Sequence, residues 1–255
     1  MSGASPPLPR NVRLLIGMRA VRSIGQGAMV AAFTLYLHAL GWSGTAIGAV
    51  LMGALLFGTV LTMIIGPLSD RGGRRAFLFG YDLVQAAAAV VAMWTTTPWI
   101  LVLAAVVGAF GRGANGSAGA FSPVEQAWLA IELPMARRGT IFSINSAVGF
   151  AGMGVGAMLA AVPAWLLGHA MSAHEYRLLF VLPLAGSLGA SALLCLARDP
   201  VVDALHDRRD DAANRVRREE NKLLGKLVLA NLLNGLGIGL IGPLIAYWFA
   251  IKFHR

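Results

Sequence analysis

Long stretches without a charged side chain divide this sequence. The longest runs from Ser23 to Ser69, and others cover Leu83–Gly111, Gly139–His174, Leu178–Ala197 and Leu227–Ile251. As a helix, the first run would be about 70 Å long, more than twice the ~30 Å hydrocarbon thickness of a bilayer. It must therefore turn, and Gly41-Trp42-Ser43-Gly44 is the predicted place. Thr95-Thr96-Thr97-Pro98 divides the second run in the same way.

The pattern predicts seven membrane-spanning helices. They are expected at 16–40, 44–66, 76–95, 98–121, 140–162, 177–197 and 227–250. The alternating pattern of a membrane barrel is absent, and a backbone in lipid must satisfy its own hydrogen bonds, so the predicted fold class is an all-α integral membrane protein. A cleavable signal peptide is the alternative for the first segment. It is disfavoured because the apolar stretch is too long and leads directly into a second helix.

Composition agrees with a membrane protein. Of the 255 residues, 57% are hydrophobic and 13% are charged, against about 45–50% and about 25% in soluble domains. This excludes an ordinary soluble domain, and it excludes a disordered chain, which lacks apolar surface. The single cysteine, Cys195, excludes a disulfide framework and a multi-cysteine metal site.

The basic residues predict the orientation. With the N-terminus in the cytoplasm, seventeen of the 21 Lys and Arg fall inside, three fall outside, and Arg112 lies within the membrane. The net charge of +9 is therefore a topology signal, and nucleic-acid binding is excluded because no soluble basic face exists. A seven-helix receptor is excluded because it would place the N-terminus outside. The predicted organisation is a six-helix bundle over 1–197, a cytoplasmic linker over 198–226 and a seventh helix within 227–255.

A short polar segment after the second predicted helix carries the most specific motif. It reads Gly66-Pro67-Leu68-Ser69-Asp70-Arg71-Gly72-Gly73-Arg74-Arg75. Glycines permit a positive φ in a tight turn, and arginines are favoured beside anionic headgroups. A turn explains the glycines and arginines but does not demand the spacing G-x-x-x-D-R-x-G-R-R. This spacing resembles the hallmark loop of the major facilitator superfamily of secondary transporters.

Further segments are similar to the same superfamily. They are Arg112-x-x-x-Gly116 in the fourth helix, Glu132 with Arg137-Arg138-Gly139 before the fifth, Gly152-x-x-x-Gly156-Ala157 in the fifth, and Asn231-Leu232-Leu233-Asn234-Gly235 in the seventh. The fifth-helix segment resembles the antiporter signature, but Ala157 stands where proline is expected, so the direction of transport stays open. Small residues at this spacing also serve close helix packing.

The resemblance implies a mechanism. It implies alternating access by two six-helix bundles that rock around a midplane site. The implied conformational latch is the hallmark loop, with Asp70 engaging the second bundle; its residues are Gly66, Asp70, Arg71, Gly73, Arg74 and Arg75. Such transporters have about twelve helices, and seven are predicted here. We expect a truncated product. The alternatives are a half-transporter that pairs with a second polypeptide supplying helices 8–12, and a non-transporting assembly or sensory partner.

Charged residues at membrane depth are candidates for function because they are costly without a partner or a pore. The resemblance places Arg112 near the substrate and proton pathway. Its alternative role is an ion pair with Asp82, at a comparable depth on the third helix, or with Glu125. A carboxylate such as Asp82 is also a candidate for proton coupling, although a structural ion pair is favoured because the third helix is usually peripheral in this superfamily.

Several amides at membrane depth complete the candidate pathway. They are Gln26, Asn115, Asn231 and Asn234, with interhelical hydrogen bonds as the alternative role. No metal or cofactor is predicted, since the histidines lack metal spacing and the G-x-G-x-x-G at Gly237–Gly242 lacks a preceding strand. No nucleophile and base constellation suggests an enzyme. The expected function is proton-coupled transport of a small solute across the cytoplasmic (inner) membrane, with drug-like lipophilic compounds favoured by analogy. The expected partners are the solute and the lipid bilayer.

Overall fold

The computed structural model describes residues 7–111, 119, 121–167, 171–199 and 245–253. Within these ranges all regular structure is helical. The helices are α1 (Arg10–Ala39), α2 (Gly44–Gly72), α3 (Arg74–Trp94), α4 (Pro98–Gly108), α5 (Ser122–Glu132), α6 (Met135–Leu167), α7 (Ala173–Leu178), α8 (Val181–Leu196) and α10 (Ile245–Phe253). The predicted linker from residue 200 on and the predicted seventh helix up to residue 244 lie outside the described residues. α10 covers the end of that predicted helix and continues past residue 250.

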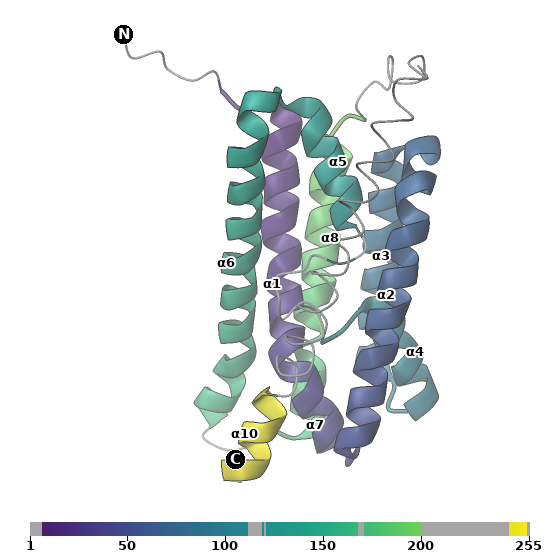
Figure 1. The fold of residues 1–255 in the computed structure, drawn as a ribbon. Coiled ribbons are helices and arrows are strands. Elements are labelled where there is room, and N and C mark those ends of the chain that lie inside the picture. Colours follow the sequence, from purple (N-terminus) through teal and green to yellow (C-terminus); the bar gives the residue numbers. More distant parts are fainter. Residues whose placement is uncertain (1–6, 112–118, 120, 168–170, 200–244, 254–255) are drawn as a thin grey trace, which may run out of the picture.

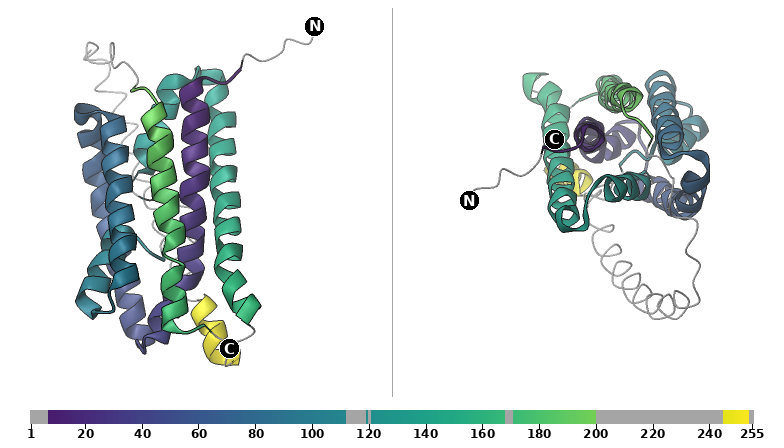
Figure 2. Two further views of the ribbon diagram at one scale, coloured as in Figure 1. Left: turned by 180° about the vertical axis from the view of Figure 1, so that it is seen from behind. Right: turned by 90° about the horizontal axis from the view of Figure 1, so that it is seen from above.

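The long helices stand side by side as an upright bundle (Figure 1). α1 lies at its centre and packs along α6 and α8, while α3 packs on α8 and α4, and α2 packs on α4. The view from above shows α1 surrounded by the other elements (Figure 2). The short α10 lies near the far end of α1 and contacts it, with the ring of Tyr247 edge-on to that of His38 at 5.1 Å between centroids.

The first helix begins earlier than the sequence predicted. It begins at Arg10, directly after Pro9, rather than near residue 16. Arg19 and Arg22 therefore lie about 13 and 18 Å along the helix, and both are buried. Counting them as cytoplasmic loop charges was wrong. Without Arg19 and Arg22, fifteen basic residues remain inside against three outside. The predicted orientation therefore now depends on those fifteen arginines and lysines.

The predicted fourth helix is not continuous. α4 ends at Gly108, where Ala109 takes a left-handed conformation with φ of 57°, and Gly111 follows with φ of 75°. A second helix, α5, then begins at Ser122 and ends at Glu132. A single span over 98–121 was therefore wrong. No charged or strongly polar residue marks the break at Gly108–Phe110, so the hydropathy pattern could not reveal it.

The hallmark segment is mostly helix rather than loop. α2 continues to Gly72, and the whole turn is Gly73, whose φ of 85° requires a glycine, before α3 begins at Arg74. A loop over the full segment was therefore wrong, and of the two glycines only Gly73 has a positive φ. The outer turns are as predicted, since Gly41 has φ of 81° and α4 begins at Pro98.

Glycines bring α6 and α1 into backbone contact. A Cβ at Gly152 would lie 2.9 Å from both the carbonyl oxygen of Ala20 and the Cβ of Ser23. A Cβ at Gly156 would collide with the carbonyl group of Ile24 and lie 2.9 Å from the backbone nitrogen of Ala28. Small residues let membrane helices approach this closely. The glycines of the antiporter-like segment therefore serve helix packing in this bundle.

The outer surface of the bundle is apolar. Four described helical segments are long and apolar enough to cross a membrane: Gly44–Ile65, Arg74–Trp94, Met135–Leu167 and Ala173–Leu196. Three highly exposed tryptophans, Trp94, Trp99 and Trp165, are 83%, 84% and 80% exposed. They lie at the end of α3, the start of α4 and the end of α6, which share one end of the bundle (Figure 1). Tryptophans are enriched where the membrane meets water, so this end marks one interface.

The predicted orientation can be tested by cysteine labelling. In a Cys195→Ser background, we expect Thr96→Cys, in the turn between α3 and α4, to react with a membrane-impermeant maleimide added to intact cells. Ala136→Cys, exposed at the start of α6, should react only after the cells are permeabilised, because the basic ends of the helices stay in the cytoplasm. The reverse pattern of labelling would show that the N-terminus lies outside.

Candidate functional site: a buried charge cluster

Two charged side chains form a close ion pair inside the bundle. Arg22 of α1 donates from Nε to Oδ1 of Asp82 on α3 at 2.9 Å, and from Nη2 to Oδ2 at 2.8 Å. Asp82 is 0% and Arg22 4% exposed. This fork geometry is the strongest arrangement for an arginine and a carboxylate. Both oxygens of Asp82 are thereby satisfied, and the pair ties α1 to α3.

A second carboxylate lies beside the pair but is held more loosely. Glu125, in the first turn of α5, is 1% exposed. Its Oε2 lies 3.7 Å from Nη1 of Arg22, and its Oε1 accepts from Nδ2 of Asn145 on α6 at 3.5 Å. The first distance is too long for a hydrogen bond. Oε2 of Glu125 and Nη1 of Arg22 have no hydrogen-bond partner among the residues that the structure describes.

An aromatic ring and a second arginine complete the cluster. The guanidinium of Arg22 lies 4.0 Å from the ring centroid of Phe121, and that of Arg19 lies 5.8 Å from it. A cation over an aromatic face is stabilised by the ring quadrupole. The charge of Arg19 also acts on Glu125. We name Arg19, Arg22, Asp82, Glu125 and Asn145 the charge cluster; its two cations balance its two carboxylates.

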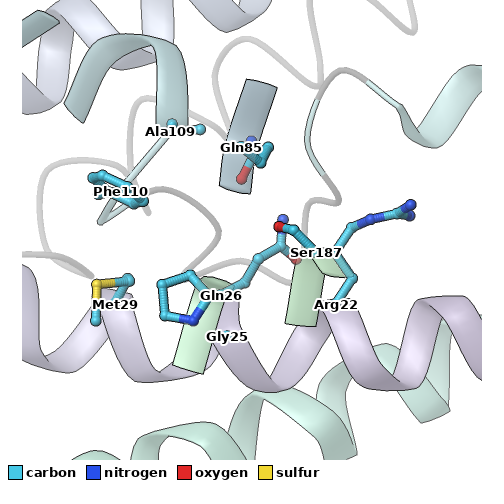
Figure 3. A pocket seen from close by; sticks show the side chains of 10 residues that line it. Arg22, Gly25, Gln26, Met29, Gln85, Ala109, Phe110 and Ser187 are labelled. Carbon is cyan, nitrogen blue, oxygen red and sulfur yellow. The ribbon is translucent and has the colours of Figure 1, made fainter. Parts of the chain in front are cut away.

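A small cavity with a mixed polar and apolar lining lies next to the charge cluster (Figure 3). It has a volume of about 10 Å³, and its polar lining includes Arg22, Gln26, Gln85 and Ser187. Figure 3 shows the guanidinium of Arg22 pointing away from Phe110. A space of this size holds about one water molecule. The structure thus places the predicted pathway residue Gln26 at a cavity that, among the described residues, is too small for an organic solute.

The hallmark turn contacts the end of α8. Asp199 accepts from the backbone nitrogen of Arg75 at 3.0 Å, and Nη2 of Arg75 donates to the carbonyl oxygen of Cys195 at 3.0 Å. Because Arg75 lies in the first turn of α3, the Asp199 carboxylate also occupies a favourable place at a helix N-terminus. Gly66, Asp70 and Arg71 lie on α2, but the side chains of Asp70 and Arg71 are outside the description. The predicted latch therefore stays a prediction.

Glu132, the last residue of α5, is tied to the N-terminus of α1. Oε1 of Glu132 accepts from Nδ2 of Asn11 at 2.6 Å and from Nε1 of Trp128 at 3.2 Å. Asn11 also exchanges hydrogen bonds with the backbone of Arg198 at 3.0 and 3.2 Å. Glu132 thus joins the end of α5 to the start of α1 and the end of α8.

Four predicted site residues lie outside the described residues. They are Arg112, Asn115, Asn231 and Asn234. The predicted ion pair of Asp82 with Arg112 therefore stays a prediction, although Arg22 already occupies both oxygens of Asp82.

Sequence reasoning missed most of the charge cluster. Arg19 and Arg22 were assigned to orientation, Glu125 was weighed only as a partner of Arg112, and Asn145 was not singled out. One available signal was Pro9, because proline favours the beginning of a helix. A helix that begins there carries Arg19 and Arg22 one turn apart and well inside the membrane.

The fold and the site define the class of the protein. A helical bundle that presents apolar side chains outward and encloses paired charges is a multi-pass integral membrane protein. A model of the Major Facilitator Superfamily matches residues 15–254, and the chain belongs to this superfamily. Members of this family are generally secondary transporters without enzymatic activity, and the chain is of this general type. Comparison with curated proteins gives no match.

Proposed function

We propose that this protein is a proton-coupled secondary transporter that exports small lipophilic solutes across the cytoplasmic membrane by alternating access. The observation that carries the proposal is the charge cluster, which brings two arginines and two carboxylates from α1, α3 and α5 together inside the bundle. Ionisable groups inside a membrane protein are costly and typically mark an ion or proton pathway.

Two further features support the proposal. Apart from the charge cluster, the described interior is mostly apolar, which favours a lipophilic solute. The described cavity holds about one water molecule, so a solute site needs space beyond it. We place that site between this bundle and a second bundle, contributed either by a longer form of this chain or by a second polypeptide carrying helices 8–12.

Reconstitution into liposomes tests this function. With an imposed pH gradient, we expect the protein to move the lipophilic cation ethidium across the membrane, and the movement to stop when nigericin collapses the gradient. Gly154→Ala, on the exposed face of α6, serves as a control and should transport normally, since a Cβ there meets nothing within 4 Å. Movement only after a second polypeptide is added would identify a half-transporter. No gradient-dependent movement in either preparation would contradict lipophilic export.

A further inference from the structure

We propose that Glu125 is the carboxyl group of the charge cluster that takes up and releases a proton, while Asp82 stays ionised in its pair with Arg22. This inference rests on the proposed proton coupling and names the group that performs it. The proton is transferred from hydronium in the aqueous phase to a carboxylate oxygen of Glu125 and later returned to water on the other side. No electrons are exchanged.

The two carboxylates differ in the number of hydrogen bonds that protonation would break. Protonating Asp82 would break one of two charge-assisted hydrogen bonds of 2.8 and 2.9 Å, which are about twice as strong as neutral ones. Protonating Glu125 at Oε2 breaks no hydrogen bond with a described residue, because that atom accepts none there and lies 3.7 Å from Arg22. Glu125 therefore gains a proton at a smaller local cost.

The hydrogen bond that Glu125 does accept tolerates either protonation state. Nδ2 of Asn145 donates to Oε1 at 3.5 Å, the long limit of a hydrogen bond. This donor remains compatible when the other oxygen, Oε2, carries the proton. Asn145 also has an oxygen, Oδ1, that is buried and without a partner in the described part of the chain, and an amide oxygen can accept a hydrogen bond from a protonated carboxyl group.

The charged and titratable groups that face Glu125 come from the helices packed against α5. α1 contributes Arg19 and Arg22, and α3 contributes Asp82, with Tyr81 beside the same arginine. α6 contributes the neutral amide of Asn145. α2 contributes the apolar Ile65 to the adjacent core, and the side chains of its Asp70 and Arg71 lie outside the description.

Protonation of Glu125 would change the balance of the charge cluster. With both carboxylates ionised, the cluster is neutral; with Glu125 protonated, it carries one net positive charge. The attraction between Glu125 on α5 and the two arginines on α1 is then lost, while the tie between α1 and α3 through Asp82 persists. Protonation therefore weakens the contact between α5 and α1, and this contact is where proton binding would be coupled to a movement of the helices.

Infrared difference spectroscopy of the protein in liposomes tests this assignment without a transport assay. Between alkaline and acidic buffers, we expect a carbonyl band of a newly protonated buried carboxylic acid. The band should shift when the protein carries ¹³C-labelled glutamate and should not shift with ¹³C-labelled aspartate. It should vanish in Glu125→Gln and persist in Glu132→Gln, a matched control on the same helix whose carboxylate is held by Asn11 and Trp128.

The outcomes separate this assignment from the proposed function. A band that shifts with labelled aspartate, survives in Glu125→Gln, or is absent from the unmodified protein overturns the inference. Isotope labelling uses the unmodified sequence, so it decides between glutamate and aspartate even if Glu125→Gln fails to fold. A glutamate band that vanishes in Glu125→Gln, in a protein that moves no ethidium, would support the assignment and contradict lipophilic export.

Discussion

The Arg22→Ala substitution is expected to destabilise the folded bundle by about 3–5 kcal/mol. The substitution leaves Asp82, which is 0% exposed, without the guanidinium that donates to both its oxygens. A buried carboxylate without a partner must either stay charged in an apolar surrounding or take up a proton. Thermal unfolding of the purified protein in detergent measures the effect as a lower midpoint temperature.

Two variants control this experiment. Arg13→Ala removes an exposed arginine from the same helix and should change the midpoint little, since solvated charges contribute little to stability. The double variant Arg22→Met with Asp82→Leu should recover part of the loss, because apolar side chains of similar volume can replace a buried ion pair at small cost, while Glu125 still loses the neighbouring charge of Arg22. Equal midpoints for Arg22→Ala and Arg13→Ala would show that the pair does not stabilise the bundle.

The Gly156→Leu substitution is expected to prevent α6 from packing on α1. Even a Cβ at this position collides with the carbonyl group of Ile24, and that group is part of the helix backbone and cannot rotate away. Overpacking typically costs about 1–3 kcal/mol where side chains can shift, so a clash with backbone should cost more. We expect most of the protein to aggregate, which size-exclusion chromatography in detergent measures as loss of the monodisperse peak.

A glycine two residues away provides the matched control. A Cβ at Gly154 meets nothing within 4 Å, so Gly154→Leu adds the same side chain on the exposed face of the same helix. Leucine favours a helix over glycine by nearly 1 kcal/mol, so this variant should keep the monodisperse peak. If both variants behave alike, close contact between α6 and α1 does not hold the bundle together.

Features set by a residue and its immediate neighbours could be predicted from the sequence. The turn at Gly41 and the start of α4 at Pro98 were predicted correctly, because a positive φ and a fixed φ are properties of glycine and proline themselves. The hallmark segment was harder. Its charges suggested a loop, but α2 continues through it to Gly72, because charged side chains at the membrane surface are compatible with a helix.

Side-chain contacts that depend on which helices pack together, and through which of their faces, could not be predicted. Arg22 and Asp82 are 60 residues apart, and their pairing depends on how α1 and α3 are rotated about their own axes. Depth along the chain suggested Arg112 as the partner of Asp82, but depth says nothing about which face of a helix a side chain occupies. The break after Gly108 is likewise invisible in the hydropathy pattern, because Gly108, Ala109 and Phe110 carry no charged side chain and the left-handed conformation of Ala109 is set by packing.

The sequence by itself determined that this is a helical, multi-pass membrane protein of the Major Facilitator Superfamily. A helix that spans a bilayer needs a long apolar segment whatever its neighbours are, and the spacing of a motif is also local. Both can therefore be recognised in each segment of the sequence separately. The tertiary structure alone decided that Arg22 holds Asp82, that Glu125 is held loosely beside them, and that Gly152 and Gly156 admit α1. These contacts depend on close packing between distant segments, which no single segment specifies.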